Sequence, residues 1–333
     1  MVEQQGKGTP LMQAKDLKMH FNIRGRGKLH AVDGVSFDIY PGETLGLVGE
    51  SGCGKSTVGN VVMRLLKATS GTLLFQGKNV FTARGAESRA LRRKMQIIFQ
   101  DPYSSLNPKK NIESILGEAY QINHLAEGAE LKQKIRELCD IVEIPYNLLD
   151  HYPHELDGGT RQVVGIARAL SLSPEFIVCD EPVSSLDVSV QARIINLLMD
   201  IQKKMGIAYL FISHDLSVVR HISNRIAVMY LGQIVELADA DDMFSDTMHP
   251  YSIALLSAVP RIDMEKRVSR IVLKGDVPSP INPKPGCRFA PRCWMAQERC
   301  FKESPELRDI KCGHCVACHY AESSREKIQK VLV

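Results

Sequence analysis

The chain has 333 residues, of which 44% are hydrophobic and 24% are charged, an ordinary composition for a globular protein in water. This length allows two domains, or one large domain with an appendage. The net charge of +4 is small and no long basic stripe accompanies it, so we do not expect a nucleic-acid partner.

No apolar run approaches the roughly 20 residues that span a bilayer. The first ten residues are polar and lack the apolar core of a signal peptide. We therefore expect a protein that is cytosolic, or that sits on a membrane only by holding a partner.

Short apolar runs separated by turns predict strands along most of the chain. Residues 11–39 alternate between apolar and polar, most clearly at 32–39, and Pro41-Gly42 then makes a turn. Further strands are expected at residues 45–48, 71–76, 94–99, 176–179 and 208–213, and a hairpin broken at Gly232 is expected at 226–235.

Helical spacing separates several of these strands. Apolar residues recur at helical intervals at 58–65, across 111–149, at 160–170 and at 190–205. The stretch at 111–149 predicts a helical insertion between two halves of a sheet domain. Strands that alternate with helices imply an α/β fold with a mostly parallel sheet, whose ligands bind beyond the carboxyl ends of the strands.

A glycine-rich loop, Gly-Glu-Ser-Gly-Cys-Gly-Lys-Ser-Thr at residues 49–57, follows one strand and opens a helix. Its glycines let backbone N–H groups converge on phosphate oxygens at the helix N-terminus. Lys55 can reach the β- and γ-phosphates, and the Ser56 hydroxyl can ligate Mg²⁺. A plain turn would explain the glycines but not the Lys-Ser pair, so we predict a nucleoside triphosphate site. The expected nucleotide-binding residues are Gly49, Ser51, Gly52, Cys53, Gly54, Lys55, Ser56 and Thr57.

Polar residues at other strand ends complete the predicted chemistry. Asp180 ends an apolar run as a Walker B aspartate does and would hold Mg²⁺, while Glu181 would polarise the attacking water. His214 would contact the γ-phosphate, and Gln100 would sense Mg²⁺ or the water. Because Gly49 also lies at a strand end, these residues predict a single site.

A family resemblance extends this interpretation. Residues 156–162, Leu-Asp-Gly-Gly-Thr-Arg-Gln, resemble the signature motif of ABC ATPases. Residues 185–187 resemble their D-loop, Gln100 their Q-loop and His214 their switch histidine, with all motifs in family order from about residue 11 to 255. The resemblance implies a RecA-like P-loop NTPase fold with an antiparallel β subdomain and a helical subdomain at about residues 101–160.

In that family two nucleotide-binding domains pair head to tail, with ATP between one P-loop and the other signature. The resemblance therefore implies that Asp157, Gly158 and Gly159 face the partner's ATP. It also implies that Phe21 stacks on adenine, although a plain strand residue is the competing interpretation.

The tail narrows the resemblance. Residues 249–251, 275–280 and 286–319 resemble the C-terminal extension of oligopeptide/dipeptide/nickel-type ABC importers, most of all their second ATPase subunit. This implies a nucleotide-binding domain at 1–259 and an extension at 260–333. It also implies ATP hydrolysis coupled to di- or oligopeptide uptake at the cytoplasmic face of the cell membrane.

The implied partners are a second ATPase in a heterodimer, two membrane-spanning permeases and an extracytoplasmic substrate-binding protein. Oligosaccharide or nickel stays open as cargo. An ABC ATPase acting on ribosomes or DNA is a different class of function, for which the chain lacks a second P-loop and a long coiled-coil insert.

One departure from the family matters for chemistry. Its signature has a serine where this chain has Asp157 and a glutamine where it has Thr160. An ionised aspartate cannot donate a hydrogen bond to the γ-phosphate and would repel it. We predict that the composite site using this signature is impaired, unless Asp157 is only a helix N-cap that is protonated or turned away.

Six of the nine cysteines crowd the last fifty residues, which in a cytosolic chain predicts metal rather than disulfides. Cys287, Cys293, Cys300 and Cys318 match the family pattern that in some members holds a [4Fe–4S] cluster. Four thiolates can equally hold Zn²⁺. Cys312 or Cys315 could replace an upstream ligand.

Overall fold

The computed structural model describes residues 8–258 and 271–322. The chain divides into two compact units. Unit 1 holds the described residues up to Tyr40, Thr44–Phe81, and those from Ser213 onward, and unit 2 holds Pro41–Glu43 and Thr82–Ile212. Of the predicted extension at 260–333, residues 260–270 and 323–333 lie outside the described part.

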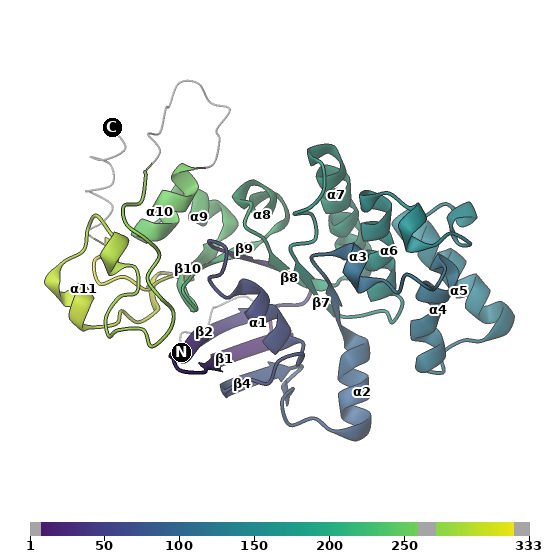
Figure 1. Ribbon diagram of the computed structural model, residues 1–333, viewed down its shortest axis with the longest axis horizontal. Coiled ribbons are helices and arrows are strands. Elements are labelled where there is room, and N and C mark those ends of the chain that lie inside the picture. The colour runs from purple at the N-terminus through teal and green to yellow at the C-terminus, as the bar shows by residue number, and fades with distance from the viewer. Residues whose placement is uncertain (1–7, 259–270, 323–333) are drawn as a thin grey trace. The chain divides into compact units, whose positions relative to one another are not determined.

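An antiparallel sheet in unit 1 has the strand order β2-β1-β4-β5. It consists of β1 (Met12–Ile23), β2 (Gly27–Ile39), β4 (Ser70–Phe75) and β5 (Lys78–Asn79). Figure 1 shows β1, β2 and β4 side by side. The alternating stretch at 11–39 is therefore two strands, which pair from Met12 opposite Ile39 to Ile23 opposite Gly27.

A second run of strands in unit 1 carries the glycine-rich loop. Its order is β11-β12-β10-β9-β3, in which β3 and β9 are parallel and the other pairs are antiparallel. The bounds are β3 (Thr44–Val48), β9 (Arg225–Tyr230), β10 (Gln233–Asp239), β11 (Arg308–Lys311) and β12 (His314–Val316). β9 and β10 confirm the predicted hairpin, and β3 is buried along its whole length.

The helices of unit 1 are short. They are α1 (Lys55–Val62), α8 (Leu216–Ile222), α9 (Ala240–Ser245), α10 (Pro250–Ser257) and α11 (Glu298–Lys302). The expectation that the first helix continues to Leu65 is wrong, because α1 ends at Val62 and Leu65 is 56% exposed. Three residues beyond the helix, the Leu65 side chain therefore has no core to pack against.

The C-terminal extension shares the core of unit 1. β12 pairs with β10, and Val316 packs with Met248 and Ala321 in one buried cluster. Beside them Nε2 of His314 lies 2.8 Å from Oε1 of Glu236, and both side chains are almost completely buried. A buried carboxylate is stable only when it is paired, so this contact ties the extension to β10.

Unit 2 contains the three parallel strands β8 (Ala208–Ile212), β7 (Phe176–Asp180) and β6 (Met95–Ile98), in that order. Every residue of β7 and β8 is buried, as expected for parallel strands covered on both faces. The strand predicted at residues 94–99 is slightly longer than β6, which ends at Ile98, and the next residue, Phe99, is 38% exposed.

Helices make up most of the rest of unit 2, as Figure 1 shows. They are α2 (Gly85–Lys94), α3 (Pro102–Ser105), α4 (Ile112–Ile122), α5 (Gly128–Val142), α6 (Gly158–Leu170) and α7 (Val188–Met205). α4 and α5 confirm the predicted helical stretch at 111–149. α7 ends at Gly206, whose φ of 68° is the left-handed conformation that glycine adopts readily at a helix end.

Candidate nucleotide site

The loop between β3 and α1 is built so that only glycine fits at two of its positions. Gly54 has φ +107°, and a Cβ added there would lie 2.1 Å from the carbonyl oxygen of Ala31. At Gly49 the corresponding atom would lie 2.2 Å from the carbonyl oxygen of Met229. The backbone of β2 and β9 therefore holds the loop tightly, and the loop's curvature requires both glycines.

Lys55 is the first residue of α1, directly after this loop, and is only 4% exposed. Its Nζ atom donates hydrogen bonds to the carbonyl oxygens of Gly49, at 2.8 Å, and Glu50, at 3.1 Å. A buried ammonium needs such acceptors. The amine thus lies inside the curl of the loop, next to the N-terminus of α1, where a phosphate group binds favourably.

Two further predicted residues also belong to unit 1. His214 follows β8 by two residues and is exposed, in the segment that leads into α8. Phe21 is a half-buried residue of β1 that pairs with Leu29 of β2. This position fits both interpretations of Phe21, as an adenine platform and as an ordinary strand residue.

Unit 2 contains two of the predicted catalytic residues, Gln100 and Glu181, and the predicted Mg²⁺ ligand Asp180. Asp180 is the last residue of β7 and is 8% exposed. Nε2 of Gln100 donates a hydrogen bond of 3.0 Å to Oε2 of the adjacent Glu181. The two side chains are 81 positions apart in the sequence, so the parallel pairing of β6 and β7 is what makes them neighbours.

Glu181 itself has an unusual backbone. Its φ is +46°, and its N–H donates to the carbonyl oxygen of Ile212 on β8 at 2.9 Å. A glutamate in this left-handed region costs energy that the surrounding structure must offset, and such residues cluster at functional sites. The strain sits at the residue that we predict to act on water.

Asp157 caps the helix that opens with the signature-like residues. Its carboxylate accepts hydrogen bonds from the N–H of Thr160, at 2.8 Å, and from the Thr160 hydroxyl, at 2.7 Å. The hydrogen bond from that hydroxyl lowers the pKa of Asp157 below its ordinary value. Asp157 is thus an N-cap, as the alternative held, but its lowered pKa means that it is ionised at neutral pH.

The two glycines after Asp157 allow close packing inside unit 2. A Cβ added at Gly159 would lie 2.6 Å from the side chain of Val190, and one added at Gly158 would lie 3.3 Å from Leu186. The start of α6 therefore packs directly against residues 186–190. The exposed carboxylate of Asp157 is left facing solvent, where a second molecule can reach it.

Four of the six clustered cysteines surround one small cavity in the extension. They are Cys287, Cys293, Cys300 and Cys318, and Cys312 and Cys315 do not line this cavity. Burial raises the pKa of Cys293 to about 12 and that of Cys318 to about 11. A thiol with a raised pKa is a poor nucleophile, and all four cysteines line one shared cavity.

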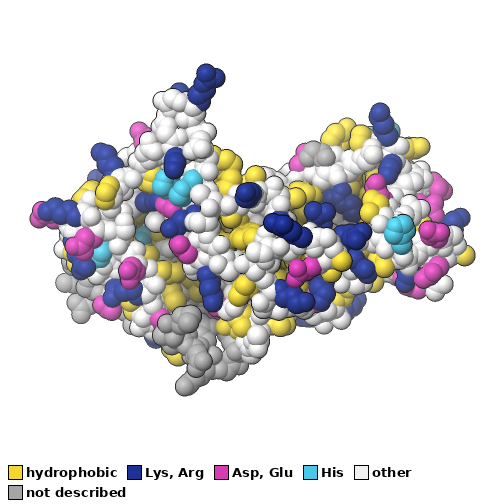
Figure 2. Space-filling view, turned by 90° about the horizontal axis from the view of Figure 1, so that it is seen from below, with side chains coloured by type: hydrophobic (Ala, Val, Ile, Leu, Met, Phe, Trp, Pro, Cys, Tyr) yellow, Lys and Arg dark blue, Asp and Glu magenta, His cyan; other side chains and the backbone are white. Residues whose placement is uncertain are grey.

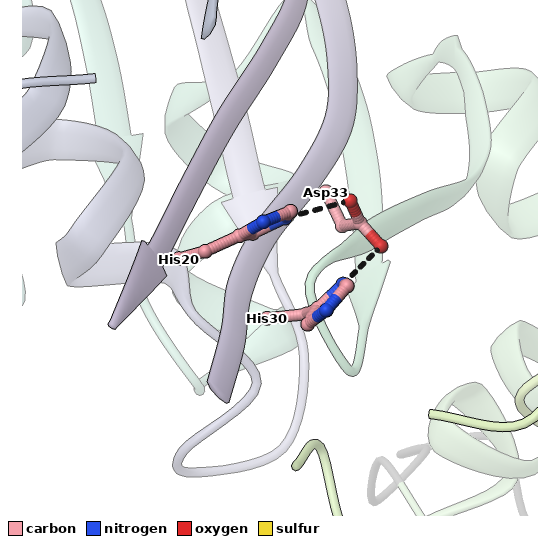
Figure 3. A group of neighbouring side chains, drawn as sticks. All are labelled: His20, His30 and Asp33. Atoms are coloured by element: carbon pink, nitrogen blue, oxygen red, sulfur yellow. Dashed lines mark hydrogen bonds and ion pairs between the residues drawn. The ribbon is translucent and has the colours of Figure 1, made fainter. Parts of the chain in front are cut away.

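The sequence did not predict a group of polar side chains on the sheet of β1 and β2, drawn in Figure 3. His20 Nε2 and His30 Nδ1 each lie 2.9 Å from an oxygen of Asp33, and the two imidazole rings stack. Arg288 of the extension also pairs with Asp33. Burial alone raises the pKa of Asp33, but these hydrogen bonds and the guanidinium outweigh it and lower the pKa to about 2. A cation would have to displace Arg288, so this group is an anchor for the extension.

Two observations concern the surface. Among the helices of residues 8–258 and 271–322, none combines the length and the apolar character that crossing a bilayer requires. On the face drawn in Figure 2, lysine and arginine side chains lie among acidic, histidine and hydrophobic ones. Charges of both signs are ordinary for a protein surface in water.

Comparison with known proteins agrees with these features. A family model described as ABC transporter matches residues 32–184, and one described as oligopeptide/dipeptide transporter, C-terminal region matches residues 235–300. YkfD of Bacillus subtilis is 48% identical over 96% of this chain and 98% of its own length. The dipeptide transport ATP-binding protein DppF of Haemophilus influenzae is 45% identical, over 97% of this chain and 100% of its own length.

A solved structure supports the fold. The dimeric ATP-binding cassette MJ0796, described in a post-hydrolysis state with ADP and Pi, superposes with a TM-score of 0.62 at 26% identity. The match covers 69% of this chain and 98% of the cassette. The expected P-loop NTPase fold of an ABC ATPase is therefore confirmed. The chain belongs to the ATP-binding subunits of ABC transporters, in the oligopeptide/dipeptide family.

Proposed function

We propose that this ABC ATPase drives the import of di- or oligopeptides. The observation that carries the proposal is the combination of an ABC transporter ATPase domain with an extension of the oligopeptide/dipeptide type. DppF, which matches along its whole length, is named a dipeptide transport protein. Oligosaccharide and nickel remain the alternative cargoes, because cargo is selected by other subunits.

The ATP-hydrolysing machinery is assigned residue by residue. Lys55 and the loop N–H groups hold the β- and γ-phosphates, Ser56 and Asp180 hold Mg²⁺ with Gln100, and Phe21 stacks on adenine. Glu181 takes the proton of the attacking water, and His214 contacts the γ-phosphate. No covalent intermediate is needed, because phosphoryl transfer depends on positioning and charge neutralisation. The hydrogen bond between Gln100 and Glu181 supports a shared role for this pair.

The partners follow from the same assignment. We propose a heterodimer with a second ATPase, in which each ATP lies between one P-loop and the other chain's signature residues. The exposure of Asp157 supports this arrangement, since a partner can reach it. The dimer would sit at the cytoplasmic face of the cell membrane beneath two permeases, fed by a substrate-binding protein. We retain residues 1–259 as the nucleotide-binding domain and 260–333 as the extension.

The two composite sites would be unequal. Where this chain supplies the signature, Asp157 would face the partner's γ-phosphate with a negative charge instead of a donor, because its pKa is lowered. Where this chain supplies Lys55 and Glu181, the site would be competent. Replacing Glu181 by Gln should abolish most hydrolysis of the assembled complex, whereas the equivalent change in the partner should cost little. Equal losses would refute the asymmetry.

We also propose that Cys287, Cys293, Cys300 and Cys318 hold a [4Fe–4S] cluster. In a tetrahedral zinc site with Zn–S bonds of about 2.3 Å, the four sulfurs lie only about 3.8 Å apart. Among the described residues, no three cysteine sulfurs lie within 4.8 Å of one another. Four thiolates that line one cavity suit a [4Fe–4S] cluster, in which each thiolate binds a different iron. Such a cluster would cross-link the loops of the extension.

The cysteine proposal has a direct test. Protein purified without oxygen should show visible absorption from sulfide-to-iron charge transfer, and Cys300→Ser should remove it. Cys312→Ser is the matched control, because Cys312 is exposed and does not line the cavity. A colourless sample that contains zinc would overturn the assignment.

A further inference from the structure

An acidic side chain stands at the second position of the phosphate-binding loop. Glu50 directly follows Gly49, and its carboxylate is 30% exposed. A triphosphate is negatively charged, so a carboxylate in the loop that binds it repels the ligand unless a positive charge offsets that carboxylate. The structure provides that charge from a distant part of the sequence.

Arg292 of the extension forms a bidentate ion pair with Glu50. Its Nη1 atom lies 2.9 Å from Oε2 and 3.3 Å from Oε1, and its Nη2 atom lies 3.3 Å from Oε1. The Arg292 side chain is only 9% exposed. A bidentate pair of this kind fixes the carboxylate in direction as well as in charge.

The backbone of Glu50 is held at the same time. Its N–H donates to the hydroxyl of Tyr251 on α10 at 2.9 Å. Its carbonyl oxygen accepts from Nζ of Lys55 at 3.1 Å and from the N–H of Cys53 at 3.3 Å. Any shift of Glu50 therefore moves a hydrogen-bond partner of the lysine that binds phosphate.

Arg292 reaches the loop from a rigid support. It ends the short 3-10 helix Ala290–Arg292, in which its N–H donates to Phe289, and it directly precedes Cys293. Four residues earlier Arg288 pairs with Asp33 and with the carbonyl oxygen of Leu231. Because this segment is held at both arginines, Arg292 loses little conformational freedom when it pairs with Glu50.

We propose that Arg292 is a positioning residue for ATP binding. It neutralises Glu50 and holds the loop so that the N–H groups and Lys55 meet the phosphates. The extension thus contributes directly to the nucleotide site of its own chain, whatever the neighbouring thiols hold. The competing role is a purely structural one, in which the pair only pins the extension to the rest of unit 1.

The test compares variants in the assembled transporter, measuring KM for MgATP, kcat and the melting temperature. Arg292→Ala should raise KM by about fivefold or more, because the carboxylate of Glu50 then repels the nucleotide. Arg299→Ala is the matched control, since Arg299 pairs with Glu303 on the exposed side of the same extension, and it should leave KM within about twofold. Arg292→Lys keeps the charge without the bidentate geometry and should fall between the two.

The double variant Glu50→Gln with Arg292→Ala separates the two roles. Positioning through charge predicts that the double variant reverses most of the rise in KM caused by Arg292→Ala, because a neutral loop needs no counter-charge. A purely structural pair predicts no recovery, with a lowered melting temperature and an unchanged KM in Arg292→Ala. That result would overturn the proposal. If Arg292→Ala does not assemble, Arg292→Gln decides, because it removes the charge but keeps most of the side chain, and an unchanged KM there would overturn the proposal equally.

Discussion

Replacing Asp157 by serine should raise ATP turnover at the proposed composite site, in which this signature faces the partner's P-loop. The carboxylate is ionised and exposed, and it accepts both hydrogen bonds from Thr160. At about 4 Å from a phosphate charge, one unit charge repels another by about 1 kcal/mol in water and about 4 kcal/mol at an effective dielectric near 20. Since about 1.4 kcal/mol is a factor of ten, removing the charge should raise turnover between about fivefold and a thousandfold.

The same substitution should hardly change folding stability. Serine and aspartate are similarly good N-caps, so Asp157→Ser should keep the free energy of unfolding within about 0.5 kcal/mol. Asp157→Ala removes the charge and the cap together, and it should cost about 1 kcal/mol of stability while still relieving the repulsion. Asp157→Asn keeps a cap without charge and tests the repulsion alone.

The assay is steady-state ATP hydrolysis by the purified complex that carries Glu181→Gln in this chain. That background silences the site built on this chain's own P-loop, so the remaining signal comes from the site under test. A rise in turnover for Asp157→Ser, with a smaller rise for Asp157→Asn, supports the reasoning. Turnover that stays unchanged in both would show that Asp157 does not face the partner's phosphate.

Three further predictions concern the described residues directly. Gly54→Ala should abolish nucleotide binding measured by calorimetry and lower the free energy of unfolding by at least about 2 kcal/mol, because its Cβ would clash with the carbonyl oxygen of Ala31. The control is Gly165→Ala in α6, where a Cβ would meet nothing within 4 Å, and it should be neutral or stabilising by up to about 1 kcal/mol. Equal effects of the two substitutions would refute the packing argument. Mass spectrometry after brief alkylation should find Cys312 modified first and Cys53 and Cys179 last, because burial raises the pKa of the latter two thiols. Early alkylation of the Cys53 thiol would contradict its burial. The stability that Asp33 contributes should be fully present above about pH 4 and lost as the pH falls toward 2, since its folded pKa is about 2. In urea unfolding between about pH 5 and 3, the free energy of unfolding should fall with pH, and this dependence on pH should be weaker in Asp33→Asn. An identical dependence in both proteins would exclude the ion-paired state.

The phosphate-binding loop could be predicted from the sequence because its chemistry is local. Nine consecutive residues carry the curl, the lysine and the hydroxyl, and the strand and helix on either side follow from nearby apolar residues. The helical stretch at 111–149 could be predicted for the same reason. The end of α1 could not, because Leu65 continues the helical spacing without a core to bury it.

The contacts between distant residues lay beyond sequence reasoning. Gln100 meets Glu181 because β6 and β7 pair in parallel, and neither residue carries a sign of the other. Arg292 lies 242 positions from Glu50, and the motif that contains Glu50 explains its glycines and lysine without requiring an acid. Spacing alone also could not decide between the cysteines, whereas the cavity separates Cys318 from Cys312 and Cys315.

The most direct test of the central claim is peptide uptake by the whole transporter reconstituted in vesicles, with ATP supplied on the side of this chain. We predict that the wild-type complex accumulates a labelled peptide only with ATP. The complex with Glu181→Gln should still bind ATP but accumulate no peptide. Peptide uptake that persists undiminished in the Glu181→Gln complex would contradict the account.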